Sequence, residues 1–244
     1  MKKIFYLVAI ATTMMFTACS SNEKTDWDKY ELKGKVKELT IEYYTPSIYG
    51  PDKMEISMAE EISFDKDGRI TQRSEFGRNR MPYGSYEYTY EKEDNVKRTK
   101  IYRAEHDYKV IENTYEDDRI TETREYFCDK LVTVVKDIEY NEEGLVTKES
   151  VYDADGKLWN TTEYEYDEQG HETKFIVRSS TGRTEIERTT TYNEDGFKAS
   201  EKEGVYNTEY TYDEFDKKGN FISRKIKDEG RRTETIEKRT IVYY

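Results

Sequence analysis

The feature that most constrains the fold is a short turn motif that recurs along the chain. An aromatic residue, Asp or Asn, two further residues and Gly occur together at six places: "SFDKDGR" (63–69), "EYNEEGL" (139–145), "VYDADGK" (151–157), "EYDEQG" (165–170), "TYNEDGF" (191–197) and "EFDKKGN" (214–220). Two degenerate copies place Asp94 and Asp118 at the glycine position. The spacing is about 25 residues with a half-unit of about 12, which indicates one supersecondary unit copied along the chain.

A half-unit of this length accommodates one β-strand and one turn. Between the turns the residues alternate with period two, as in 86–90, where Tyr86, Tyr88 and Tyr90 share one face, and in 163–166 and 209–212. This alternation predicts strands with one buried face. The high tyrosine content and the scarcity of proline, with 23 Tyr and 3 Pro in the chain, also favour strands.

The turn chemistry explains the motif. An Asp or Asn at the first turn position accepts a hydrogen bond from the backbone two residues on, and Gly at the last position takes a positive φ. The aromatic residue before the turn then closes the strand pair through cross-strand contact. Two strands per unit would place all these turns on one edge of the sheet, with the mid-unit turns on the opposite edge.

These patterns predict an all-β fold. We expect an elongated antiparallel β-meander of about sixteen strands between residues 35 and 243, built from hairpin repeats. Because open twisted sheets rarely exceed about ten strands without curling, the meander is predicted to curl into a trough or open half-barrel with the aromatic face on its concave side. Residues 26–244 are assigned to this single domain.

The N-terminus predicts export. Lys2 and Lys3 precede an apolar run over 4–16, which is too short to span a bilayer, and "FTAC" (16–19) follows. Residues 1–19 resemble a bacterial lipoprotein signal, in which cleavage before a cysteine exposes it for lipid attachment. The resemblance implies a signal peptide at 1–18, lipid on Cys19 and a polar tether at 19–25; the alternative is an ordinary signal peptide that happens to contain Cys19. Lipid on Cys19 would leave Cys128 without a disulfide partner within the mature chain.

The charge balance disfavours nucleic acid as a partner. The formal net charge is −12, and loss of Lys2 and Lys3 makes the mature chain −14. A chain with this charge is repelled by phosphate backbones, and the sequence contains no basic cluster interleaved with aromatic residues.

The turns also resemble a known repeat family. "Phe64-Asp65-Lys66-Asp67-Gly68-Arg69-Ile70", with similar stretches at 166–170 and 215–221, resembles the YD repeat of RHS-type bacterial proteins over roughly residues 62–227. The chain is most similar to small secreted lipoproteins built from such repeats, with "LKGKVKEL" (32–39) as a typical first strand. This resemblance implies an open β-meander attached to the cell envelope, specifically the outer membrane of a Gram-negative bacterium.

Sequence patterns for catalysis or metal binding are weak. His106 and His171 lie far apart beside predicted turns, Cys128 has no accompanying Cys/His cluster and is interpreted as a small buried residue, and no Gly-rich phosphate loop is present. The acidic turns lack the spacing of a calcium loop and are interpreted as turn formers. We therefore expect no cofactor, no metal and no catalytic residue.

The tyrosine face has two interpretations. It forms the core of the sheet, or it is a platform on which sugars stack or a partner's strand docks. The candidate ligand-binding residues are Tyr88, Tyr90, Tyr164, Tyr166, Tyr210, Tyr212 and the exposed aromatic Trp159. The sequence predicts a non-enzymatic, lipid-anchored binding or scaffold surface for glycan or protein. The alternatives are a glycosidase-like hydrolase with an acidic pair in the trough and a purely structural spacer.

Overall fold

The computed structural model describes residues 25–47, 50–104, 107–230 and 233–244, with backbone only at a few positions beside the gaps. Sixteen strands are present, together with a one-turn helix α1 (Asp26–Lys29) and a 3-10 turn η1 (Arg78–Arg80). The strands are β1 (Val36–Ser47), β2 (Gly50–Phe64), β3 (Ile70–Phe76), β4 (Pro82–Glu93), β5 (Val96–Ala104), β6 (Asp107–Glu116), β7 (Arg119–Phe127), β8 (Lys130–Tyr140), β9 (Val146–Asp153), β10 (Leu158–Tyr166), β11 (Glu172–Ser179), β12 (Thr184–Tyr192), β13 (Lys198–Glu203), β14 (Tyr206–Phe215), β15 (Phe221–Asp228) and β16 (Thr233–Tyr243).

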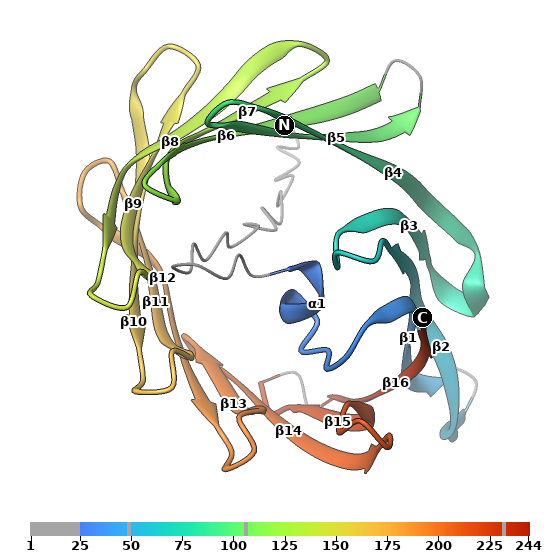
Figure 1. Ribbon diagram of the computed structural model, residues 1–244. Helices are drawn as coiled ribbons and strands as arrows, with labels where there is room; N and C mark the ends of the chain where they lie inside the picture. The colour runs from blue at the N-terminus through green and yellow to red at the C-terminus, as the bar shows by residue number, and fades with distance from the viewer. Residues whose placement is uncertain (1–24, 48–49, 105–106, 231–232) are drawn as a thin grey trace, which may run out of the picture.

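The sheet is closed. Each strand pairs antiparallel with its sequence neighbours, and β1 pairs with β16 from Val36↔Tyr243 to Tyr44↔Ile236, which completes a barrel (Figure 1). The all-β class and the sixteen antiparallel strands were predicted correctly, but the elongated trough or open half-barrel was wrong. The correction has a simple cause, because pairing of the first and last strands satisfies the backbone groups that both edges of an open meander would expose.

The repeated turns have the predicted chemistry. In 65–69, the Asp65 carboxylate accepts hydrogen bonds from the backbone N–H of Asp67 (3.0 Å) and Arg69 (2.9 Å), and Gly68 has φ +83°. Asp94 and Asp118, which replace glycine in the degenerate copies, also have positive φ. The alternation of strands gathers the turns 65–69, 94–95, 117–118, 141–145, 167–171, 193–197 and 216–220 at one end of the barrel, the glycine-turn rim. Turn 153–157 lies at the opposite rim, so the prediction that all these turns share one edge was wrong for this copy.

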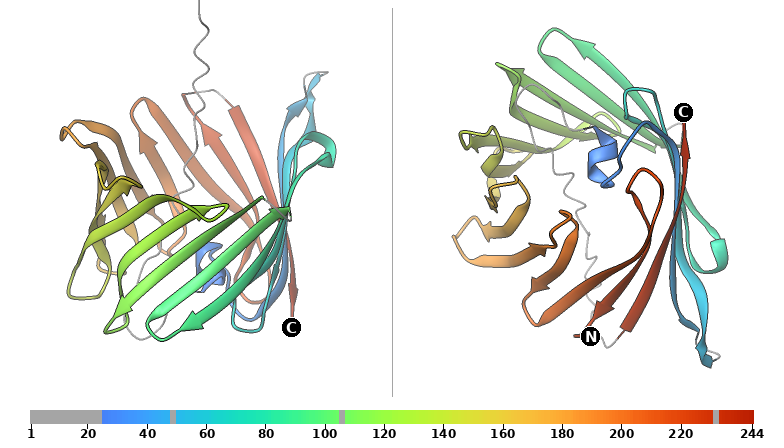
Figure 2. Two further views of the ribbon diagram at one scale, coloured as in Figure 1. Left: turned by 90° about the horizontal axis from the view of Figure 1, so that it is seen from above. Right: turned by 60° about the horizontal axis from the view of Figure 1, so that its bottom comes forward.

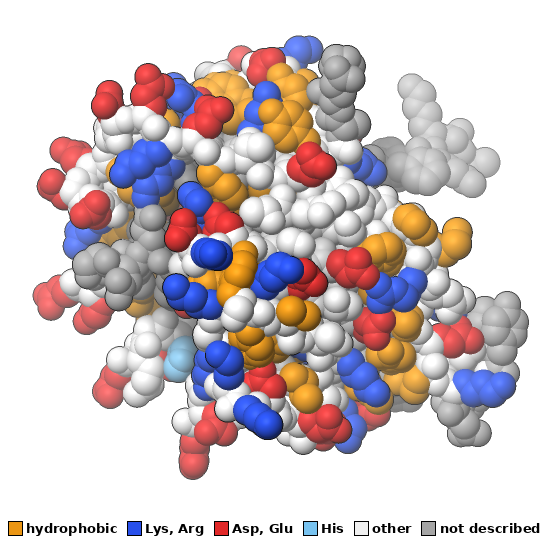
Figure 3. Space-filling model, turned by 45° about the vertical axis from the view of Figure 1, so that its right-hand side comes forward, with side chains coloured by type: hydrophobic (Ala, Val, Ile, Leu, Met, Phe, Trp, Pro, Cys, Tyr) orange, Lys and Arg blue, Asp and Glu red, His pale blue; other side chains and the backbone are white. Residues whose placement is uncertain are grey.

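The inward face of the barrel holds an apolar cluster on β1 and β2, and charged residues elsewhere. Leu39, Ile41, Ile62 and Phe64 are buried there in one cluster. The outward positions between these residues are polar, for example Glu38, Thr40 and Glu42 of β1, Glu122 and Arg124 of β7, and Glu209 and Thr211 of β14. Figure 3 shows acidic, basic and uncharged polar side chains interspersed with separate hydrophobic patches. The side chains follow the period-two alternation predicted from the sequence.

An N-terminal plug, residues 25–33, lies inside the barrel (Figure 2). Asp26 donates its N–H to the Gly68 carbonyl (2.9 Å) and its carboxylate accepts the Ile70 N–H (2.8 Å). The Trp27 indole donates to the Val36 carbonyl (2.8 Å). Thr25, which the sequence assigned to the tether, caps α1 and therefore belongs to the fold, whereas Cys19 and the rest of the predicted signal and tether lie outside the described residues.

In the part of the chain that the structure describes, no helix has the length and apolar character needed to cross a membrane.

Candidate functional site

Four of the tyrosines that precede the repeated turns serve the fold. Tyr90, Tyr140, Tyr166 and Tyr192 each donate a hydroxyl hydrogen bond to the backbone carbonyl of the residue twenty positions earlier, at 2.7–3.0 Å. Each acceptor lies two residues after the glycine position of the preceding turn, which is Gly68, Asp118, Gly144 or Gly170. These tyrosine clamps therefore tie the end of one strand to the start of its neighbour at the glycine-turn rim.

The candidate ligand-binding tyrosines are dispersed around the barrel. Tyr90 and Tyr166 are clamps, and Tyr212 donates to the Lys198 carbonyl (3.0 Å) in an aromatic cluster with Phe197 and Phe221. Tyr88 packs against the core beneath the plug. The hydroxyls of Tyr90, Tyr166 and Tyr212 are thus hydrogen-bonded to backbone carbonyls, so these side chains of the tyrosine face stabilise the fold. A ligand-binding role for this set stays a prediction.

Trp159 lies elsewhere, near the opposite rim on β10. Its side chain is 61% exposed.

Tyr164 and Tyr210 lie in a region where inward-facing residues of β10–β14 come together. Tyr164 packs edge-on against Phe175 (5.6 Å between ring centroids), and the Arg188 guanidinium lies 4.6 Å from the Phe175 ring. Arg188 also pairs with Glu172 (3.2 Å). Burial raises the pKa of Tyr210 to about 12, with the nearby Glu201 adding to the effect, so this hydroxyl is neutral at physiological pH.

Arg188 is the most informative residue in this region. Its Nε atom is buried and has no hydrogen-bond partner, and the nearest carboxylate, that of Glu201, lies 3.9 Å away. Arg73, on the opposite side of the lumen, has the same feature. A buried N–H without an acceptor is costly, so it marks a position where a ligand oxygen or a water molecule would bind.

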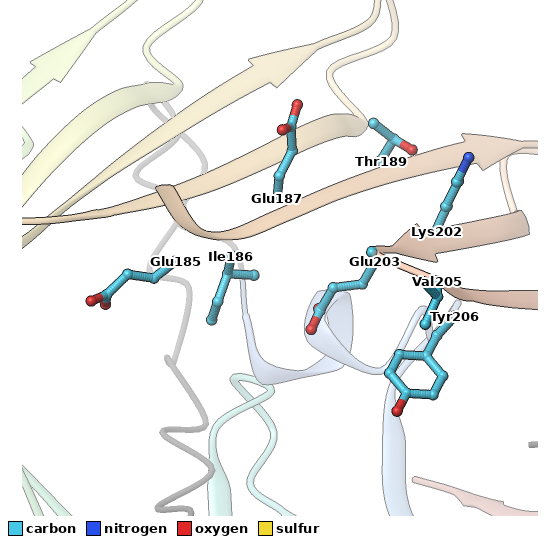
Figure 4. A pocket seen from close by; sticks show the side chains of 9 residues that line it. Glu185, Ile186, Glu187, Thr189, Lys202, Glu203, Val205 and Tyr206 are labelled. Carbon is cyan, nitrogen blue, oxygen red and sulfur yellow. The ribbon is translucent and has the colours of Figure 1, made fainter. Parts of the chain in front are cut away.

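A hollow of about 590 Å³ adjoins Arg188 toward the opposite rim. It forms because the pairing of β12 with β13 ends at Arg188↔Glu203, while β12 continues along its own direction from Glu187 to Thr184, toward the opposite rim. Figure 4 shows Ile186, Glu203 and Tyr206 on one side of the strands and Glu187, Thr189 and Lys202 on the other. Ile186 and Tyr206 are 38% and 47% exposed. We call the hollow together with Phe175, Arg188 and Glu201 the β12–β13 site.

The charges of the β12–β13 site are neutralised in pairs. Burial raises the pKa of Glu172, while the Arg188 guanidinium acts in the opposite direction. Glu201 pairs with Lys198 (3.2 Å). Carboxylates held by cations in this way accept hydrogen bonds and orient a polar ligand.

Glu149 is the one inward carboxylate here whose described partner is a hydroxyl, that of Tyr164 (2.8 Å). Burial raises the pKa of Glu149. Glu172 also lies close enough to Tyr164 to help raise the pKa of its hydroxyl, so two acidic residues flank this tyrosine.

A second charge cluster fills the lumen beneath the plug. Glu237, which has no exposed surface, accepts hydrogen bonds from Arg224 (2.6 Å) and Arg239 (2.7 Å), and Arg239 also donates to the Tyr30 carbonyl (2.8 Å). The Arg224 guanidinium stacks over Tyr210 and Phe221. All three charges are satisfied within the fold, so this cluster serves to dock the plug.

The acidic turns use their carboxylates for the backbone. The Asp153 carboxylate accepts the N–H groups of Asp155 (3.1 Å) and Lys157 (2.8 Å), as the turn interpretation predicted. His171 bonds the Asp167 carboxylate (3.0 Å) and stacks on Tyr192, and Cys128 occupies the β7–β8 turn. Within the described ranges, no group of three His, Cys, Asp or Glu side chains is arranged to hold a metal ion.

Comparison with known proteins supports the barrel. No family model and no curated protein matches this sequence. Among solved structures, a porin-like protein from Bacteroides uniformis is similar with a TM-score of 0.60 and 12% identity, over 85% of this chain and 96% of that one. A porin-like protein from Bacteroides vulgatus gives a TM-score of 0.48 and 9% identity over 87% and 99% of the chains. The similarity to the first of these shows that the chain shares a closed antiparallel barrel fold with a porin-like protein.

Proposed function

We propose that this chain is a non-enzymatic barrel of the bacterial cell envelope, tethered to the outer membrane by lipid on Cys19, that binds a glycan at the β12–β13 site. The observation that carries the glycan assignment is the unpaired buried Nε of Arg188, which lies over Phe175 beside an open hollow. Phe175 itself is buried beneath Arg188, so the aromatic face open to a sugar ring is that of Tyr206, which lines the hollow and is 47% exposed. An exposed aromatic face with a few fixed donors and acceptors beside it is the combination that such a ligand requires.

The outward face supports a tether rather than an embedded barrel. Transmembrane barrels have an outward apolar band about 25 Å tall, and Arg or Lys facing lipid at the midplane costs about 2–4 kcal/mol each. Here outward cross-strand ion pairs lie within the wall, including Arg98–Glu112 (2.6 Å) and Arg178–Glu163 (3.1 Å). The similarity to a porin-like protein therefore supports the barrel architecture, while this surface favours a position outside the hydrocarbon.

The hydrolase and spacer alternatives are less well supported. Glu172 and Glu201 are held by Arg188 and Lys198, and Glu187, which lines the hollow, pairs with Lys174 (3.5 Å), which disfavours a catalytic pair built from these carboxylates. A spacer does not need a buried arginine N–H without an acceptor beside a hollow. A protein ligand would use the same opening, but the small volume and the buried donor favour a sugar.

Binding is tested on a glycan array with residues 20–244, which keep Thr25, followed by titration calorimetry of any glycan that binds. Tyr206→Ala removes an aromatic wall of the hollow and should weaken binding at least about fivefold, because a stacking platform contributes roughly 1–3 kcal/mol. Tyr83→Ala is the matched control, since Tyr83 is 72% exposed on β4. Absence of glycan binding by the native protein, or equal affinity of both variants, would refute the assignment.

Anchoring is tested by fractionation of cells that express Cys19→Ala. At high salt, which screens charge contacts with lipid headgroups, the variant should move from the membrane to the soluble extracytoplasmic fraction, because the lipid is then the only attachment of the barrel. Retention in the membrane would show instead that the barrel itself is embedded.

A further inference from the structure

Five exposed lysines gather on one sector of the glycine-turn rim, around the start of β1. This lysine sector consists of Lys33, Lys35, Lys66, Lys217 and Lys218. The Lys218 side chain lies over Gly34, because a Cβ added to Gly34 would be 3.1 Å from the Lys218 Cδ. The Lys33 side chain lies near Gly219, because a Cβ added to Gly219 would be 3.6 Å from the Lys33 Nζ. Tyr244 links Lys35 and Lys66, since its N–H bonds the Lys35 carbonyl (3.1 Å) and its ring lies beneath the Lys66 ammonium, while Lys217 is the sequence neighbour of Lys218 in the turn 216–220.

The lysine sector contrasts with the rest of the rim. The other turns present the acidic residues Asp94, Asp117, Asp118, Glu142, Glu143, Glu168, Glu194 and Asp195, and the whole chain has a net charge of −12. The carboxylates inside the sector are engaged locally. Asp65 and Asp67 pair with Arg69, and Asp216 accepts from Asn220 and Tyr243. Five lysines and Arg69 against these three carboxylates leave the sector with a net charge of about +3 (6 − 3) on an otherwise acidic rim.

The first described residue, Thr25, lies beside this sector. Thr25 packs against Gly68 at the glycine-turn rim, where a Cβ added to Gly68 would lie 2.9 Å from the Thr25 Cβ. Six residue steps separate Cys19 from Thr25, so even a fully extended segment spans at most about 20 Å. The adjacent strand β1 has 12 residues, which corresponds to about 40 Å of strand and about 30 Å of barrel height at the usual tilt. Lipid on Cys19 thus reaches a membrane at the glycine-turn rim but not beyond the opposite rim.

We infer that the lysine sector lies against an anionic lipid surface and fixes the barrel with its glycine-turn rim toward the membrane. This inference rests on the proposed lipidation of Cys19. A basic patch beside a lipid anchor adds electrostatic attraction to an anionic surface, which orients the protein on the membrane. The opposite rim, with the β12–β13 site, then faces away from the membrane and is open to large ligands.

Lysine footprinting tests the orientation. Natively lipidated protein is reconstituted on vesicles of phosphatidylethanolamine and phosphatidylglycerol, acetylated, and compared by mass spectrometry with the same protein in detergent. The lysine sector should be at least about fivefold less reactive on vesicles, while Lys130, Lys157 and Lys202, which lie toward the opposite rim, should be unchanged. Protection of the second set, or equal protection of both, would overturn the inference.

Charge variants test the lipid contact. A single acyl chain is attached chemically to the Cys19 thiol of residues 19–244 carrying Cys128→Ser, and vesicle binding is measured by sedimentation. Lys33→Gln, Lys217→Gln and Lys218→Gln together should weaken binding about 100-fold, since each lysine near an anionic surface contributes about fivefold.

The matched control combines Lys130→Gln, Lys157→Gln and Lys202→Gln, which should leave vesicle binding unchanged. Equal binding of the two triple variants would refute the lipid contact. Because the chain is acylated chemically, this result is independent of native lipidation. The mass of the native N-terminal peptide reports separately whether Cys19 carries lipid, so failure of the anchoring proposal is distinguishable from failure of this one.

Discussion

Gly68 holds the N-terminal plug at the rim, and its replacement by Ala tests that role. Gly68 has φ +83°, and a Cβ at this position would lie 2.7 Å from the Trp27 ring and 2.9 Å from the Thr25 Cβ. Gly156 is the matched control, because it occupies the equivalent turn position with φ +79° and has no atom within 4 Å of an added Cβ. The two substitutions therefore share the backbone strain and differ in the contact with the plug.

The expected losses of unfolding free energy follow from the backbone strain and from the contact with the plug. A non-glycine residue in the left-handed region costs about 1–2 kcal/mol, so Gly156→Ala should lower the free energy of unfolding by that amount. Gly68→Ala adds the overpacking of Trp27, which costs roughly 1–3 kcal/mol more. Its total should reach about 2–5 kcal/mol, with loss of the Trp27 hydrogen bond to Val36 if the ring is displaced.

Urea unfolding followed by tryptophan fluorescence measures the difference. A Trp159→Phe background leaves Trp27 as the sole reporter of the two tryptophans in the chain. Hydrogen exchange of the Asp26 and Leu32 amides, which bond the Gly68 and Trp27 carbonyls, should quicken in Gly68→Ala alone. Equal destabilisation by the two substitutions, with equal exchange in the plug, would show that the plug is not held by this contact.

Three further substitutions test buried polar groups. Burial raises the pKa of Glu149 above its ordinary value of 4.5. Ionisation of this carboxyl therefore lowers the free energy of unfolding as the pH rises through and above 4.5. In urea titrations, Glu149→Gln should be more stable than the native protein at pH 7 and indistinguishable from it at lower pH. Glu237→Gln breaks a buried ion cluster and should cost about 3–5 kcal/mol, against about 0–1 for the exposed control Glu38→Gln, by the same assay. Tyr140→Phe removes the hydroxyl bond to Ile120, so a loss of about 1 kcal/mol and faster exchange at the rim are expected; no change in either would contradict the clamp.

The sequence determined the local structure well. The Asp-x-x-Gly turns, the alternation and the strand number are encoded within each repeat, so they were predictable from residues such as Asp65 and Gly68 alone. Closure of the barrel was not predictable, because β1 and β16 pair at Val36↔Tyr243 although they lie at opposite ends of the sequence, and no local pattern indicates this pairing. The plug was missed for the same reason, since Trp27 gains its place only through contact with the distant Gly68 turn.

The candidate site was predicted only in part. Tyr164 and Tyr210 lie beside it, but Arg188, Glu172 and Glu201 were passed over among many charged residues. A signal for them existed in the alternation, because a charged residue at a position that shares the aromatic face, as Arg188 does, is expected to be buried and paired. The hollow itself depends on where β13 ends relative to β12, which the repeat spacing does not specify.

The tyrosine clamps explain why the repeated residues are poor guides to ligand. A residue that recurs in the repeat units has a structural role that the units share. The hydroxyls of Tyr90, Tyr140 and Tyr166 each bond a backbone carbonyl at the start of the neighbouring strand and so hold the two strands together. Groups available to a ligand must instead come from positions where one unit departs from the others. Arg188 is such a position, because its inward guanidinium retains an unpaired N–H where the short β13 opens the wall. In a barrel built from repeats, specificity is therefore to be sought in the irregular unit rather than in the conserved geometry of the turn.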